Sequence, residues 1–212
     1  MMSTLDTKKT KNTASTTPSK TSATLLINLG SPNSPEVKDV RVYLRQFLMD
    51  EFVIDVPFLF RWIIVNLIIL VFRPRKSAAA YKTIWTEEGS PLVVTSLKFG
   101  ESVKEKSNIP VEMVMRYGNP SIESGIISLN DQLESLEELF IIPMYPHYAD
   151  STWKTALEEV KFQLKRHKLA PRLKVIKPFY NHDTYINLLC NTIKPYLNKP
   201  YDHILFSYHG LP

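Results

Sequence analysis

The chain has 212 residues, of which 44% are hydrophobic, and this suits one substantial domain or two small ones. Its net charge is +5, but residues 1–22 hold four lysines and one aspartate, which leaves +2 for the remainder. So weak a positive charge gives no electrostatic footprint for nucleic acid, and no nucleic-acid partner is predicted. The single cysteine, Cys190, excludes an intrachain disulfide and an iron–sulfur cluster held by cysteines of this chain alone.

Residues 1–22 differ from the rest of the chain because they are rich in Thr, Ser and Lys. Such a segment buries too little apolar surface to offset the entropy lost on ordering, so we expect a disordered tail. It lacks the apolar core of a secretory signal. Its basic, acid-poor composition leaves an organelle transit peptide open, although the absence of arginine argues against one.

From residue 23 onward, short β-type segments alternate with stretches of helical periodicity. In chain order, the predicted strands are 24–29, 111–117, 139–145, 173–178 and 203–208. The first predicted helix follows Ser34 as N-cap and Pro35 as first helical residue. Further helices are expected on the apolar stripes Ile126–Leu129–Leu133–Leu136 and Trp153–Leu157–Val160–Leu164, the latter behind Asp150 or Ser151, and over 185–196.

This alternation predicts the fold class. Strands and helices in turn favour an α/β domain over residues 23–212, with a parallel, Rossmann-like or flavodoxin-like sheet of about five strands and helices on both faces. One region interrupts the pattern, because about eighty residues separate the first two predicted strands. A single crossover helix needs far fewer.

Within this region, residues 62–72 form an apolar run of eleven residues with one Asn. A bilayer-spanning helix needs roughly 20 apolar residues, so no transmembrane segment is predicted. Two interpretations remain open. The run is either a buried helix of the domain, or a surface helix whose apolar face meets a membrane or an apolar ligand. In the second case, lipid headgroups would lie near the flanking cations Arg61, Arg73, Arg75 and Lys76.

Unusual side chains follow the ends of the predicted strands, where an open parallel sheet binds its ligands. These ends read Leu29-Gly30-Ser31, Arg116-Tyr117-Gly118, Tyr145-Pro146-His147-Tyr148 and Ser207-Tyr208-His209-Gly210. Taken singly, the glycines and prolines are explained by turns, and a lone histidine at a strand end is more often structural than catalytic. Neither a G-x-G-x-x-G segment nor a phosphate-binding loop is present, so a nucleotide has little support.

Taken together, five segments resemble the ferrochelatase family, enzymes that insert ferrous iron into porphyrin. They read "LLINLGSP", "YKTIWTEEGSPL", "MRYGNPSIES", "IIPMYPHYADSTW" and "FSYHGLP", and the resemblance runs from Ala23 to Pro212. It implies a lyase of haem biosynthesis that converts protoporphyrin IX and Fe(II) to protohaem. The family has two similar α/β halves with the site between them, and the chain resembles the N-terminal half. With the second half absent, we expect the chain alone to be poorly active or inactive.

The resemblance also implies the site residues. His209 matches the family's active-site histidine, and its role stays open between iron ligand and acceptor of pyrrole protons. The implied substrate-binding residues are Leu29, Arg116, Tyr117, Tyr145, Tyr148 and Ser151. Leu29 would face the porphyrin, and its apolar character favours protoporphyrin over coproporphyrin. His147 and Asp150 depart from the residues of many relatives in their loop.

The resemblance further implies protoporphyrin IX and ferrous iron as substrates, no permanently bound cofactor and no iron–sulfur cluster. It favours the surface-helix interpretation, with peripheral membrane contact through the segment from Phe58 to Phe72. A cytoplasmic protein is expected, and peripheral attachment to the inner face of the membrane stays open. An alternative of another class is a non-catalytic porphyrin-binding, haem-binding or assembly module.

Overall fold

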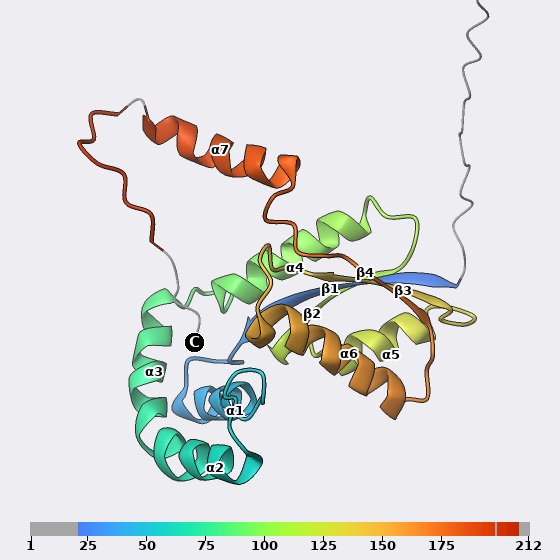
Figure 1. The fold of residues 1–212 in the computed structure, drawn as a ribbon, viewed down its shortest axis with the longest axis horizontal. Coiled ribbons are helices and arrows are strands. Elements are labelled where there is room, and N and C mark those ends of the chain that lie inside the picture. Colours follow the sequence, from blue (N-terminus) through green and yellow to red (C-terminus); the bar gives the residue numbers. More distant parts are fainter. Residues whose placement is uncertain (1–20, 198, 208–212) are drawn as a thin grey trace, which may run out of the picture.

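The computed structural model describes residues 21–197 and 199–207. Within these ranges, four parallel strands form one sheet in the order β2-β1-β3-β4 (Figure 1). Strand β1 (Ser22–Ser31) lies between β2 (Val111–Gly118) and β3 (Glu138–Pro143), and β4 (Arg172–Val175) is next to β3. The predicted α/β class is therefore confirmed. Central β1 is buried on both faces, as expected for a parallel sheet covered by helices on each side.

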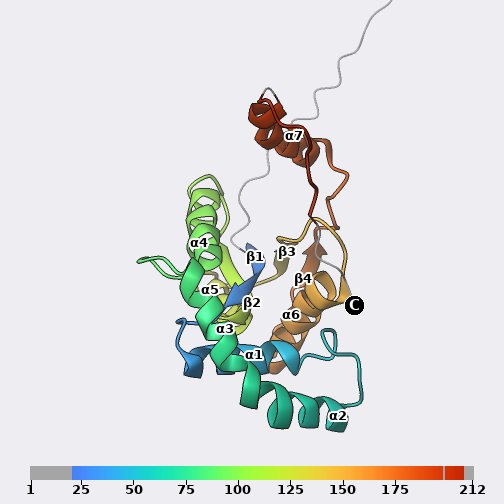
Figure 2. The same cartoon turned by 90° about the vertical axis from the view of Figure 1, so that its left-hand side faces the viewer.

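Helices cover both faces of the sheet (Figure 2). On one face, α5 (Ile122–Asp131) and α6 (Thr155–Arg166) pack their apolar side chains against β1 and β3. On the other, α4 (Pro91–Lys104) packs Val93 and Val103 against Met113 and Leu26. A third cluster joins α1 (Val37–Leu48) to the helical segment that follows it and to Tyr117 at the end of β2.

Two predicted helix boundaries differ from the structure. Helix α1 begins behind Glu36 rather than Ser34, because the Ser34 hydroxyl accepts a hydrogen bond from the Glu36 N–H (3.2 Å) and donates one to Asp39 (2.6 Å). The serine thus forms a turn before the cap. Helix α6 begins after a π-helical turn, η2 (Asp150–Lys154), whose cap is Ala149, so neither Asp150 nor Ser151 caps it.

The predicted fifth strand is wrong over its described part. Helix α7 (Asp183–Leu197) has no buried residue and stands away from the sheet in both views (Figures 1 and 2). It carries the chain away from β4, so residues 203–207 reach no strand edge with which to pair and are fully coil. Leu205 is 90% exposed. An apolar extended segment becomes a strand only when a neighbour supplies hydrogen-bond partners. Residue 208 lies outside the described residues.

The long insertion after β1 forms a continuous helical segment that wraps around α1 (Figure 2). It consists of α2 (Phe58–Ile63), the π-helix η1 (Ile64–Ile69) and α3 (Leu70–Ile84), and we call it the collar. Of its apolar run, Val65 and Leu70 are buried in the core, and Ile69 is partly buried against it. Side chains more than half exposed are Phe58, Leu59, Phe60, Leu67, Ile68, Val71 and Phe72. The collar is therefore a surface helix, and the buried-helix interpretation is wrong.

Arg61 does not lie at the surface as predicted. Its side chain is buried, and Nη1 donates to the backbone carbonyls of Ile54 (3.1 Å) and Val56 (3.0 Å). These carbonyls belong to the loop before α2 and replace water at Nη1, whereas the buried Nε has no hydrogen-bond partner. Arg61 thus fixes the collar to the loop that precedes it. None of the helices in the described ranges is both long and apolar enough to cross a bilayer.

Candidate functional site

The carboxyl ends of β1, β2 and β3 meet at one edge of the sheet, as parallel strands require. Gly30 pairs with Tyr117 across β1 and β2, and Leu29 packs against the cluster that contains Tyr117. Tyr145 follows β3 and packs against the cluster formed by β1, β3, α5 and α6. The structure thus brings together Leu29, Arg116 and Tyr117, and places Tyr145 after the neighbouring strand at the same edge. His209, the predicted iron ligand or proton acceptor, lies outside the described residues and stays a prediction.

Two glycines let β1 and β2 approach closely at this edge. Gly30 has φ +99°, and a Cβ built there would lie 1.8 Å from the Tyr117 carbonyl oxygen. Gly118 has φ +85°, with a built Cβ 2.5 Å from the Ser31 carbonyl oxygen. Residues other than glycine rarely adopt such φ values, and neither position has room for a side chain. Both glycines lie within strands, so the close approach of β1 and β2 explains them, and not a turn as predicted.

A buried ionic network lies beneath the edge. Arg116 Nη2 donates to Asp50 Oδ2 at 2.6 Å, and Nε donates to the Thr155 hydroxyl at 2.8 Å. Nη1 is 3.5 Å from a Glu159 carboxylate oxygen. The side chains of Arg116 and Asp50 are only 12% and 4% exposed. Each type of guanidinium nitrogen therefore has a partner within the protein.

Tyr117 is fully buried behind this network. Its hydroxyl donates to Asp50 Oδ2 at 2.8 Å, and its ring meets the edges of Phe47 and Tyr43. The guanidinium carbon of Arg116 lies 4.5 Å from the ring centroid. Burial strongly raises the pKa of Tyr117, against the opposing effect of Arg116, so the hydroxyl stays protonated at neutral pH. In this arrangement Tyr117 supports the edge from within the core.

Tyr145 presents a different feature, since its hydroxyl is buried and has no hydrogen-bond partner. Burial raises the pKa of Tyr145, with Arg116 acting in the opposite direction. Leaving a buried hydroxyl unpaired costs about 1–3 kcal/mol. Because this oxygen is buried, a ligand could bond to it only after the surrounding side chains move.

Tyr148 and Ser151 lie apart from these residues, in the loop before α6. Tyr148 is half exposed, and its hydroxyl donates to Asp150 Oδ1 at 2.7 Å. Lys154 pairs with Asp150 at 2.8 Å and lies 4.9 Å above the Phe52 ring. The hydrogen bond from Lys154, with that from Tyr148, lowers the pKa of Asp150. His147, the other departure from the family pattern, stacks on Tyr180.

This loop forms one wall of an open pocket with a volume of about 610 Å³. The other wall is the loop between α1 and α2. The lining residues are Glu51, Phe52, Val53, Asp55, Ala149, Asp150, Ser151 and Lys154. The volume lies within the range of ligand sites for small molecules. Within the described ranges, no three His, Cys, Asp or Glu side chains are arranged to hold a metal ion.

Sequence reasoning missed Asp50, Thr155 and Glu159, which hold Arg116. One signal was available, because an arginine at the end of a buried strand requires a carboxylate partner. Asp50 lies two residues after the end of an amphipathic helix that packs on the sheet. Asp50 and Arg116 are 66 residues apart in the sequence, so no local pattern indicated that the two side chains form an ion pair.

Known proteins share this fold and these loops. The ferrochelatase family model matches residues 21–212. Ferrochelatases of Pseudomonas syringae pv. tomato, Ectopseudomonas mendocina and Pseudomonas aeruginosa are 47%, 49% and 45% identical to the chain over 191 residues. The aligned region covers 90% of this chain but 55% of each relative, so the chain spans about half their length and corresponds to their N-terminal part. Because the match covers the whole described fold and every candidate loop, the chain belongs to the ferrochelatase family.

Proposed function

We propose that this chain contributes to the insertion of Fe(II) into protoporphyrin IX. The observation that carries the proposal is the family match across residues 21–212, which includes all of the candidate site. In the reaction, the porphyrin loses its two pyrrole N–H protons and four nitrogens bind the metal. The products are protohaem and two protons, and iron stays ferrous throughout.

Each predicted site residue would have its own role in this reaction. His209 would accept a pyrrole proton or ligate the arriving Fe(II), since imidazole is suited to both. Leu29 and Tyr145 would lie at the side of the site that faces the macrocycle, at the carboxyl ends of β1 and β3. Ser151 would contact substrate from the pocket wall, and the half-exposed Tyr148 would contact it from the same loop. Arg116 would lie beside the macrocycle, whereas Tyr117 is fully buried and would support Arg116 from within the core.

We further propose that the collar contacts a membrane surface peripherally, in a cytoplasmic protein on the inner face of the membrane. Its exposed apolar side chains are contiguous along α2, η1 and α3, and Arg73, Arg75 and Lys76 follow them. A row of this kind is typical of an interfacial helix. Protoporphyrin is flat and apolar, so a site close to lipid would give it access.

A second candidate is a non-catalytic porphyrin-binding or assembly module. It is supported by the open pocket of about 610 Å³ between residues 51–55 and 149–154, whose volume suits a small-molecule ligand whether or not metal insertion follows.

An anaerobic assay of the full chain with protoporphyrin IX and Fe(II), with Zn(II) as a second metal, tests the reaction. Absorbance would report both porphyrin binding and metal insertion. We expect saturable porphyrin binding and slow insertion. His209→Ala should lower insertion by a factor of about 100 or more, because it removes the acid–base or ligand group. The exposed His182→Ala is the matched control and should leave insertion unchanged.

Each outcome favours one candidate. Saturable binding without insertion supports the module. Insertion that survives His209→Ala contradicts the role of His209. Neither binding nor insertion contradicts both candidates.

A further inference from the structure

Asp50 lies where three elements meet. It lies two residues after the end of α1, and its Oδ2 accepts hydrogen bonds from Arg116 and Tyr117 of β2 and from Thr155 of α6. Its Oδ1 accepts the backbone N–H of Phe52 at 2.8 Å. A carboxylate that is 4% exposed needs such partners, because removing its charge from water is costly. One side chain therefore ties the loop after α1 to the sheet and to α6.

The same contacts join the two walls of the 610 Å³ pocket. One wall, residues 51–55, begins directly after Asp50. The other, residues 149–154, ends directly before Thr155. The hydrogen bond from the Thr155 hydroxyl to Asp50 thus connects the walls at their base. Breaking it would let the separation of the walls change.

The contacts also fix the guanidinium of Arg116. Its Nε, Nη1 and Nη2 face Thr155, Glu159 and Asp50. Two carboxylates face one guanidinium, so the network has a net charge of −1 and gives Arg116 no surplus charge for an anionic ligand. What Arg116 contributes to a ligand site is therefore its fixed orientation over the Tyr117 ring.

We propose that Asp50 is a positioning residue of the candidate site. It does not contact substrate; it acts through Arg116 and Thr155, by fixing the guanidinium and the separation of the pocket walls. The inference rests on the proposed function, because it takes porphyrin as the ligand.

The test uses Asp50→Asn, which keeps the shape of the side chain but removes the charge that pairs with Arg116. Protoporphyrin IX affinity of the full chain is measured by absorbance titration under conditions where circular dichroism shows the variant folded. We expect affinity to fall about tenfold for Asp50→Asn and for Arg116→Gln. The double variant should bind no more weakly than the weaker single variant, because both substitutions act through one interaction.

Glu112→Gln is the matched control. Glu112 is a carboxylate at the amino end of the same strand as Arg116, bonded to Ser128 and Gln132, and its replacement should leave porphyrin affinity unchanged. A purely structural Asp50 would lower the urea midpoint without changing the affinity of folded molecules, and that result overturns the inference. Strictly additive losses in the double variant overturn it as well.

If Asp50→Asn does not fold, Thr155→Val replaces it. This substitution removes the hydroxyl that links Arg116 Nε to Asp50 and keeps the side-chain volume. Weaker porphyrin binding supports the inference, and unchanged binding overturns it. If the unaltered chain binds no porphyrin, the proposed function fails and this inference fails with it. If the unaltered chain binds and the variants match it, only the inference fails.

Discussion

At the scale of single residues, the ligand edge of the sheet depends on glycines, which have no side chain, as well as on the side chains described above. Gly30 has a positive φ and lies against the Tyr117 carbonyl, so backbone conformation and space both exclude a Cβ. Gly89 shares the positive φ, at +121°, but a built Cβ there would meet only Val94 Cγ2, at 3.9 Å. A side chain at Gly30 would therefore meet both backbone strain and a steric clash, whereas one at Gly89 would meet backbone strain alone.

Gly30→Ala should destabilise the chain by more than about 3 kcal/mol, because it adds a backbone collision to strain. Gly89→Ala is the matched control. It should lower the free energy of unfolding by only about 1–2 kcal/mol, because the new side chain would be strained by the positive φ but would meet no backbone atom. Urea denaturation followed by circular dichroism measures both. Equal losses for the two variants would show that the close approach of β1 and β2 adds nothing.

At the scale of elements, periodicity predicted most of the architecture. Four of five predicted strands lie where expected, because a buried parallel strand needs an apolar run that is readable locally. Apolar content alone could not tell whether the collar is buried, since both interpretations need the same residues. The burial of Arg61 could not be predicted either, because its partners are backbone carbonyls, which every residue has and no sequence pattern identifies.

The collar yields an element-scale prediction. Replacing Leu67 and Phe72 together by Glu should weaken binding to phospholipid vesicles at least about tenfold, because each buried apolar side chain contributes about 1.5–3 kcal/mol. Both are exposed, so stability should change by less than about 0.5 kcal/mol per site. Vesicle co-sedimentation measures binding.

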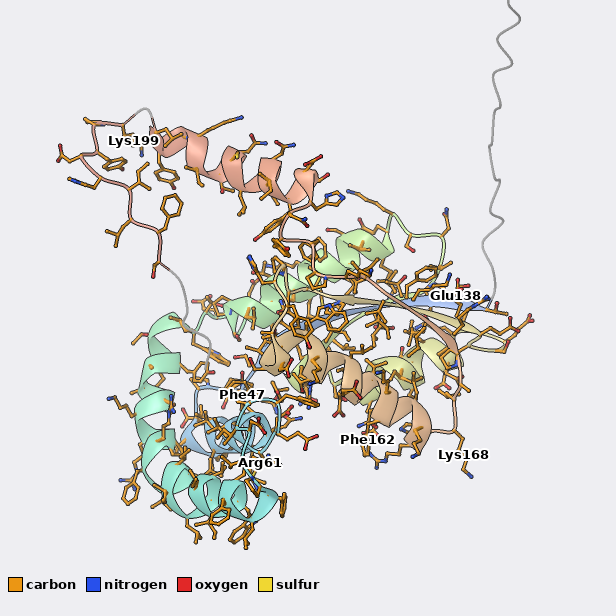
Figure 3. All side chains as sticks on the ribbon, in the orientation of Figure 1. Phe47, Arg61, Glu138, Phe162, Lys168 and Lys199 are labelled. Atoms are coloured by element: carbon orange, nitrogen blue, oxygen red, sulfur yellow. The ribbon has the colours of Figure 1, made fainter. Side chains whose placement is uncertain are left out.

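Phe162→Glu is the control for this experiment. Phe162 is 59% exposed on α6, away from the collar (Figure 3), and its replacement should leave vesicle binding unchanged. If Phe162→Glu and the collar variant lose binding equally, added negative charge is the cause. If neither loses binding, the collar does not mediate it.

At the scale of the whole molecule, the chain divides into a packed body and a detached end. Residues 22–175 contain the sheet and every buried cluster of the described ranges, whereas α7 buries no side chain. The predicted fifth strand failed for this reason. Its residues are apolar as a strand requires, but strand pairing also depends on the direction in which the preceding helix leads the chain. A local sequence pattern does not contain that information.

This division predicts uneven protection of backbone amides. Amides of α7 should exchange with deuterium at least about 100-fold faster than those of α5, because hydrogen bonds of an unpacked helix open locally. Residues 25–27 of β1, buried between two strands, should exchange slowest of all. Mass spectrometry of peptic peptides reads both. Equal protection of α7 and α5 would show that α7 packs on the body in solution.

Asp50 and Thr155 are 105 residues apart in the chain, yet their side chains share a hydrogen bond. During translation, the carboxylate emerges from the ribosome long before the hydroxyl, and before Arg116 as well. Until β2 and α6 have been made, Asp50 Oδ2 lacks its three partners and must remain hydrated, while local bonds such as those from Arg61 and the Phe52 N–H hold the loop after α1. The ligand edge is therefore a late product of biosynthesis, completed only when residues from three distant stretches have been delivered.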